Sequence, residues 1–204
     1  MILSDQAILL AIERGMIGLA PCPPRGDRRW SPTTADLTLD AEIRVWRPAT
    51  ATTDKDVVDP MAPGYDTTRL ISEDTLLANC ASGLIVEPGD FVLGWTVERL
   101  RLPHESRIGA RVEGKSSLAR IGVIVHLTAP IIHPGFGATS PDSSAPIQLE
   151  IKNHGTRRVR LTQGMPICQL MFEQVHGDFE SGGYRGQFAM QGPTTGSGAT
   201  ASGP

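Results

Sequence analysis

The chain has 204 residues, of which 40% are hydrophobic and 5% aromatic, so it is long enough for one domain with a substantial core. Its net charge is -3 with both signs interspersed, which argues against a basic surface that binds polymeric nucleic acid. No apolar run is long enough to span a bilayer, so we expect no membrane partner. Cys22, Cys80 and Cys168 are too few and too far apart for a disulfide framework. They are typical of the reducing cytoplasm, or of the host cytoplasm if the chain is viral.

The N-terminal residues predict a short helix rather than a signal peptide. Ser4 or Asp5 can cap this helix, and Gly15 can end it. Acidic residues precede the apolar ones and no cationic leader is present, which disfavours a signal peptide. Residues 21–32 are rich in Pro, Arg and Gly and therefore predict a loop.

The first predicted strand covers residues 35–39, where apolar and polar residues alternate, and residues 43–46 can continue it. Residues 49–68 are polar and contain proline, which predicts a long surface loop. Residues 72–74 can begin one helical turn.

From Leu84 onward, short β-rich runs recur between glycines and prolines. These runs are residues 84–86, 91–93, 95–97, 121–125, 147–151, 159–161 and 167–172. Closely spaced short strands with turn signals predict an all-β barrel or jelly roll. We expect one domain over residues 1–191, followed by a disordered Gly/Ser/Thr-rich tail over residues 192–204.

Residues 114–120 combine a glycine, Lys115, Ser116, Ser117 and a segment compatible with a helix. Backbone N–H groups at a helix start, hydroxyl groups and a cation can together hold a phosphate. The glycine spacing is not that of a Walker A loop. The alternative is a serine-capped helical turn with a solvated lysine.

The predicted strand at residues 147–152 places Gln148, Glu150 and Lys152 on one face. A desolvated Glu150 can shuttle protons, whereas the alternative is an exposed glutamate beside Lys152. Hydrolytic deamination of cytosine requires such a group, because water attacks C4 while N3 and the leaving amine take up protons. Zinc deaminases carry H-x-E and P-C-x-x-C motifs. This chain has neither, and its histidines show no ligand spacing, so we expect no zinc.

With these motifs in place, the sequence resembles the dCTP deaminase family of the trimeric dUTPase superfamily. The similar stretches are residues 34–39, 86–93, 102–103, 113–129, 134–136, 148–151, 164–167 and 184–187. The resemblance implies an all-β, distorted jelly-roll β-barrel of the dUTPase-like type with a few short helices. It also implies a homotrimer with active sites between subunits. The implied enzyme converts a deoxycytidine nucleotide into the deoxyuridine nucleotide, or a C5-modified one into the thymidine nucleotide, and releases ammonia without zinc.

The resemblance also implies roles for single residues. Glu150 matches the catalytic acid and base, and Ser116 and the carbonyl of Ala129 match the groups that hold the attacking water. The positions that match substrate-binding groups are Lys115, Ser117, Arg120, Leu127, His133, Phe136, Gln148, Tyr184 and Gln187. In this family, Mg²⁺ accompanies the triphosphate and does not activate the water, so no protein metal site is expected.

The sequence departs from the family at several positions. His133 stands where members usually carry an aspartate that supports hydrolysis of the triphosphate, which disfavours a dUTPase or a bifunctional enzyme, the main alternative. Pro130 and Ile131 alter the predicted wall of the site, and residues 138–146 form a longer turn. These changes predict acceptance of dCMP or a C5-modified dCTP besides dCTP. A second alternative is a non-catalytic nucleotide-binding trimer, against which the retained Glu150 argues.

Overall fold

The computed structural model describes residues 1–48, 57–126 and 128–179. The helices are α1 (Asp5–Glu13), α2 (Thr67–Asp74) and α3 (Ser116–Ala119), with a 3-10 turn η2 (His104–Ser106). The strands are β1 (Gly18–Ala20), β2 (Trp30–Ser31), β3 (Thr34–Trp46), β4 (Thr75–Asn79), β5 (Leu84–Val86), β6 (Phe91–Arg101), β7 (Ile108–Gly114), β8 (Val123–Val125), β9 (Ile131–Ile132), β10 (Ala145–Asn153), β11 (Val159–Leu161) and β12 (Pro166–Gln174). Within the described ranges, no helix has the length and apolar character needed to cross a bilayer.

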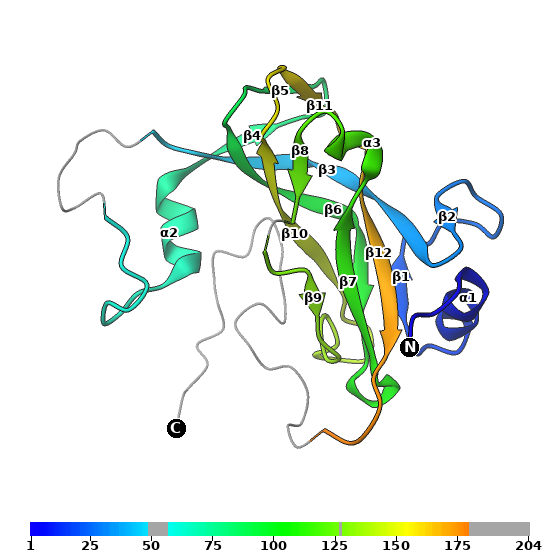
Figure 1. Ribbon diagram of the computed structural model, residues 1–204. Coiled ribbons are helices and arrows are strands. Elements are labelled where there is room, and N and C mark those ends of the chain that lie inside the picture. The colour runs from blue at the N-terminus through cyan, green and yellow to red at the C-terminus, as the bar shows by residue number, and fades with distance from the viewer. Residues whose placement is uncertain (49–56, 127, 180–204) are drawn as a thin grey trace.

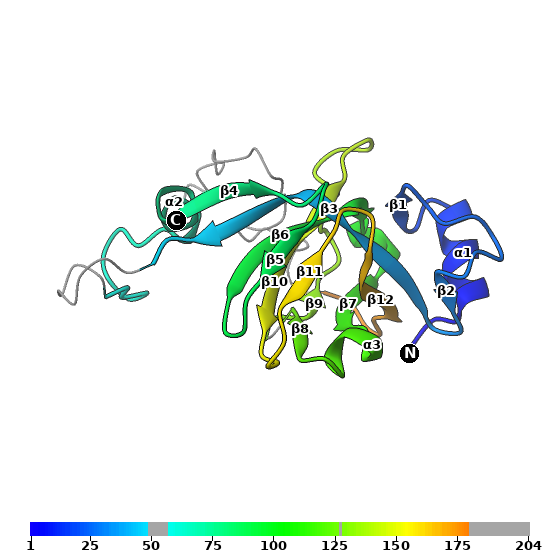
Figure 2. The same ribbon diagram turned by 90° about the horizontal axis from the view of Figure 1, so that it is seen from above.

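Most strands join one curled antiparallel sheet, in the order β8-β10-β6-β3-β12-β7-β9 (Figure 1). The long strand β3 connects its two halves: its first part pairs with β12, and its second part pairs with β6 and β4. The register shifts between Leu39 and Ile43, where β3 passes from one half to the other. Figure 2 shows how this strand runs across the molecule from α1 toward β4. The structure confirms the prediction of an all-β fold.

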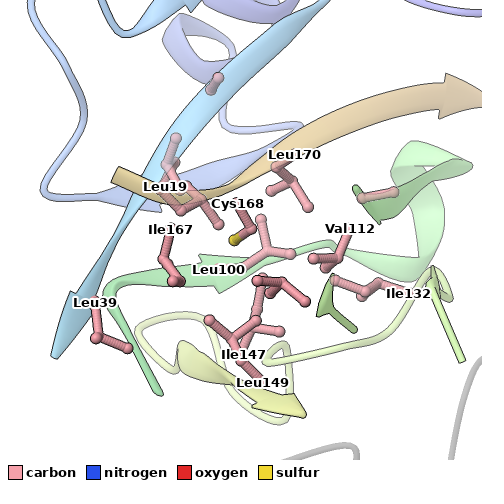
Figure 3. Packing of buried hydrophobic residues seen from close by; sticks show 14 of the residues in the cluster. Leu19, Leu39, Leu100, Val112, Ile132, Ile147, Leu149, Ile167, Cys168 and Leu170 are labelled. Carbon is pink, nitrogen blue, oxygen red and sulfur yellow. The ribbon is translucent and has the colours of Figure 1, made fainter. Parts of the chain in front are cut away.

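The core lies inside the curl of this sheet. Strands from both halves contribute apolar side chains that meet there, including Leu39, Leu100, Leu149 and Leu170 (Figure 3). These four side chains are all 0% exposed. From Ile147 to Lys152 of β10, burial alternates as predicted: the odd-numbered side chains enter the core and the even-numbered ones are only partly buried on the other face.

Two parts of the chain near α1 agree with the sequence-based expectations. The hydroxyl of Ser4 accepts a hydrogen bond from the N–H of Ala7 at 3.3 Å and caps α1. Gly15, with a φ of 70°, follows the end of α1 in the left-handed conformation expected there. The predicted loop at residues 21–32 ends in the two-residue strand β2, which pairs with the start of β3.

Residues 72–74 are helical as predicted, but they end a helix and do not begin one, because α2 runs from Thr67 to Asp74. The carboxylate of Asp66 accepts hydrogen bonds from the N–H groups of Thr68 and Arg69, at 2.8 and 3.2 Å. This cap starts the helix inside the segment that was expected to be a loop. Residues 49–56 of that predicted loop, and the predicted tail, lie outside the described residues.

All three cysteines are free thiols. Cys80 and Cys168 are buried in the core, whereas Cys22 is partly exposed in the segment between β1 and β2. Burial raises the pKa of the Cys168 thiol, and nearby Glu98 acts in the same direction.

Candidate functional site

Glu150 lies near the middle of β10, between β6 and β8 in the sheet. It belongs to the face that points away from the core, and its side chain is 34% exposed. The strand β8 ends at Val125, which pairs with Ile151, so the next residue, His126, lies opposite Glu150. The backbone N–H of His126 donates to the carbonyl of Glu150 at 2.8 Å. At 34% exposure the carboxylate is only partly shielded from solvent within one chain, so its catalytic role stays a prediction.

The imidazole of His126 links Glu150 to Ala129. Its Nδ1 lies 3.0 Å from Oε2 of Glu150, an ion-pair contact without the alignment of a full hydrogen bond. Its Nε2 lies 2.6 Å from the carbonyl oxygen of Ala129. The structure thus brings together two of the three residues predicted to be catalytic, and it does so through a histidine that the sequence did not single out.

Opposing influences act on the charge of His126, whose side chain is 9% exposed. Burial disfavours the imidazolium, but the adjacent Glu150 carboxylate and the Ala129 carbonyl favour it, and together they raise the pKa of His126. The backbone of His126 is also unusual, because its φ of 60° lies in the left-handed region. Such a conformation in a residue other than glycine is a signal that only the structure reveals.

The segment predicted to hold phosphate forms α3, which packs beside β8 (Figure 1). Lys115 occupies the N-cap position without a side-chain cap bond, and its Nζ lies 2.5 Å from Oδ2 of Asp36 on β3. The Lys115 side chain is 19% exposed, so the alternative of a serine-capped turn with a solvated lysine is wrong. Ser116, Ser117 and Arg120 are exposed on or next to α3 and are accessible to an anion.

The other positions expected to bind substrate fall into three groups. Gln148 is partly exposed on the same face of β10 as Glu150, and His133 is exposed on the turn after β9. Phe136 is 5% exposed and belongs to the core cluster, so its contact with a sugar stays a prediction. Leu127, Tyr184 and Gln187 lie outside the described residues.

The longer turn at residues 138–146 is tied down at both ends by hydrogen bonds. The hydroxyl of Ser143 donates to the carbonyl of Gly137 at 2.7 Å. Nε of Arg99 on β6 donates to the hydroxyl of Ser144 at 3.2 Å. The strand β10 already begins at Ala145, so the turn ends two residues earlier than predicted, and its anchored end continues into the strand that carries Glu150.

A carboxylate, an imidazole and a carbonyl in one cluster can exchange protons and hold a water molecule. The Ala129 carbonyl has two lone pairs, so it can accept from water while it accepts from His126. A partly buried carboxylate is suited to general acid and base catalysis.

Comparison with known families shows which family the chain belongs to. Residues 2–175 match a family model described as dCTP deaminase-like. A dCTP deaminase, dUMP-forming, of Nocardioides sp. is 36% identical over 202 residues, which cover 95% of this chain and 93% of the relative. A protein of the same name from Methanosphaera stadtmanae is 34% identical over 175 residues, which cover 85% of this chain and 79% of the relative.

Among solved structures, the fold is similar to that of 2'-deoxycytidine 5'-triphosphate deaminase from Agrobacterium tumefaciens. The TM-score is 0.59 at 20% sequence identity, over 86% of this chain. This chain spans about half the length of that solved chain, with 48% covered. The likeness confirms the predicted fold class.

Proposed function

Because the chain belongs to the dCTP deaminase family, we propose that this hydrolase removes the 4-amino group of dCTP and forms dUTP and ammonia, with Glu150 as the acid and base. The proposal rests on the position of Glu150. Its side chain is partly buried and is connected to the Ala129 carbonyl through the imidazole of His126, which contacts both groups.

The reaction uses one water molecule and no protein-bound metal. The Glu150 carboxylate takes a proton from the water as its oxygen attacks C4, and gives that proton to N3. The second water proton passes through Glu150 to the amine, which leaves as ammonia while the C4 carbonyl forms. The hydroxyl of Ser116 and the carbonyl of Ala129 hold the water in line with C4.

The substrate is dCTP bound to Mg²⁺, which arrives with the triphosphate. The names of the curated relatives give dCTP as their substrate, whereas nothing in them supports the expected acceptance of dCMP or of a C5-modified dCTP. Ser117 and Arg120 are exposed at α3 and can reach a triphosphate. Lys115 adds positive charge there, although Asp36 already neutralises part of it.

A second candidate is the conversion of dCTP to dUMP, because the curated relatives are named dUMP-forming. That product requires a further hydrolysis of the triphosphate. His133 stands where the family resemblance places an aspartate for this step. We therefore propose that dUTP accumulates, and separation of the products of dCTP by chromatography distinguishes dUTP from dUMP.

We also propose a homotrimer of the reducing cytoplasm, with sites between subunits. Leu76 and Leu77 on β4 are 49% and 64% exposed. A second copy of the chain would cover these apolar side chains. Three free thiols support the reducing compartment.

The decisive experiment measures ammonia release from dCTP by the wild type and by Glu150→Gln. We expect Glu150→Gln to lower kcat at least about 10²-fold, because the amide cannot accept the proton of water. Glu173→Gln is the matched control, since Glu173 is a partly exposed strand glutamate on β12, and we expect it to retain activity. An unchanged rate in Glu150→Gln would refute the assignment of the acid and base. A wild type that binds dCTP without releasing ammonia would support the non-catalytic alternative.

A further inference from the structure

The contacts of His126 determine where protons lie around Glu150. The carbonyl of Ala129 can only accept a hydrogen bond, so Nε2 of His126, at 2.6 Å, must carry a hydrogen. Nδ1 then faces Oε2 of Glu150 at 3.0 Å. Either Nδ1 is protonated and faces a carboxylate, or Glu150 is protonated and faces a bare nitrogen. The state in which neither side chain carries this proton would set the Nδ1 lone pair against the carboxylate and is disfavoured by repulsion, so the pair holds one proton on one side chain or the other.

We propose that His126 is a positioning residue that shares one proton with Glu150 and orients its carboxylate for the deamination described above. This role rests on the proposed function, in which Glu150 must accept and donate protons in turn. His126 would start and end each cycle with the same proton, so the stoichiometry of one water consumed and one ammonia released is unchanged.

Among the residues that the structure describes, Glu150 is the charged partner of His126. From β10, Lys152 lies on the same face, but its Nζ lies 3.3 Å from the carbonyl of Gly89. The strand β8 contributes only apolar residues, Val123–Val125. From the α3 segment, Lys115 pairs with Asp36, and Arg120 is exposed.

The backbone and the side chain of His126 both contact Glu150. The N–H of His126 donates to the Glu150 carbonyl at 2.8 Å, while the imidazole contacts the carboxylate of the same residue. This double contact is made with a φ of 60°, a conformation that residues other than glycine rarely adopt. A strained backbone that aims a side chain at a reactive group is typical of functional sites.

The test compares His126→Asn and His126→Ala with the wild type across pH 5 to 9. Asparagine tolerates the left-handed conformation and keeps a polar side chain, but it does not titrate. We expect His126→Asn to lower kcat about tenfold or more while KM changes less than about threefold. We also expect it to remove the alkaline limb of the kcat profile, which in the wild type follows loss of the shared proton. His126→Ala is expected to lose activity more completely.

The matched control is Arg107→Asn, because Arg107 is the other residue besides glycine with a positive φ in the described part of the chain, at 54°. We expect this control to keep the wild-type kcat and pH profile. If His126→Asn matches the wild type in kcat and alkaline limb, the proposal fails. It also fails if Arg107→Asn reproduces the effects of His126→Asn.

A measurement without substrate separates this proposal from the proposed function. Titration of the ¹⁵N-labelled imidazoles in the nucleotide-free enzyme reports the protonation of His126, which the His126→Asn spectrum assigns. We expect a raised pKa in the wild type that falls toward the ordinary value in Glu150→Gln. If the pKa of His126 is the same in the wild type and in Glu150→Gln, the proposal that the two side chains share a proton fails. If the pKa of His126 shows the expected dependence on Glu150 but the wild type releases no ammonia from dCTP, only the proposed deaminase activity is refuted.

Discussion

At the scale of single residues, His126 shows where sequence reasoning stops. The position of Glu150 on the outer face of a strand could be predicted, because the alternating apolar pattern around it is visible in the sequence, whereas its catalytic role stays a prediction. His126 follows the apolar residues 123–125, but neither its positive φ nor its contact with Ala129 has a local signal. Both depend on the pairing of β8 with β10, residues that lie far apart in the sequence.

The His126–Glu150 pair predicts a pH dependence of stability. Folding raises the pKa of His126 above its ordinary value of 6.5, so the folded state holds the proton more tightly than the unfolded state. The resulting stabilisation is full below about pH 6.5 and is lost as the pH rises through the raised value. We expect the urea midpoint to fall across this interval in the wild type and to fall less in His126→Asn.

The exposed His176 provides the control for this experiment. We expect His176→Asn to show the wild-type decrease with pH. The linkage would be contradicted by a midpoint that is constant from pH 6 to pH 8 in the wild type, or by equal slopes in the wild type and His126→Asn.

Among the strands, those with continuous apolar runs could be predicted from the sequence, whereas those whose apolar pattern is interrupted could not. The predicted runs at residues 84–86 and 159–161 coincide with β5 and β11. The strand β7 was missed because glycines, an arginine and a glutamate interrupt its apolar pattern. Its pairing partner β12 supplies the hydrogen bonds and burial that keep it extended. The prediction at residues 121–125 began too early, because β8 starts at Val123.

The turn before β8 depends on the close packing of Gly122 against Gly155. Gly122 has a φ of 87°, and a Cβ atom there would lie 2.3 Å from the Cα of Gly155. We therefore expect Gly122→Ala to displace the turn before β8, to destabilise the protein by roughly 2 kcal/mol or more, and to reduce activity by moving His126. Urea denaturation and ammonia release measure the two effects.

Gly114→Ala serves as the comparison for stability, because a Cβ at Gly114 meets no atom within 4 Å and its φ is not positive. We expect its urea midpoint to stay close to that of the wild type. Equal stability of Gly122→Ala and the wild type would show that the turn has more room than the structure indicates.

At the scale of the whole molecule, the family and the all-β class could be predicted, whereas the arrangement of subunits could not be read from one chain. Chain order and motif spacing specify the family. Which surfaces meet depends on side chains such as Leu77, whose exposure appears only after β4 has paired with β3. An exposed leucine on a strand is meaningful only when the surface around it is known.

The proposed trimer predicts a mass in solution of about three times the 21.9 kDa of the chain. Light scattering coupled to size-exclusion chromatography measures this mass. We expect Leu77→Asp to lower the mass, because a buried carboxylate would oppose association, whereas Leu10→Asp on α1, 43% exposed, leaves it unchanged. A wild-type mass equal to one chain would refute the trimer.

The unequal exposure of the three thiols makes the native protein suitable for site-selective labelling. A maleimide dye is expected to attach at Cys22, because Cys80 and Cys168 are shielded by the core. Burial also raises the pKa of the Cys22 thiol, so coupling is expected to proceed faster in mildly alkaline buffer. One fluorophore per chain, introduced without mutagenesis, would provide a spectroscopic reporter between β1 and β2 for titrations with nucleotide.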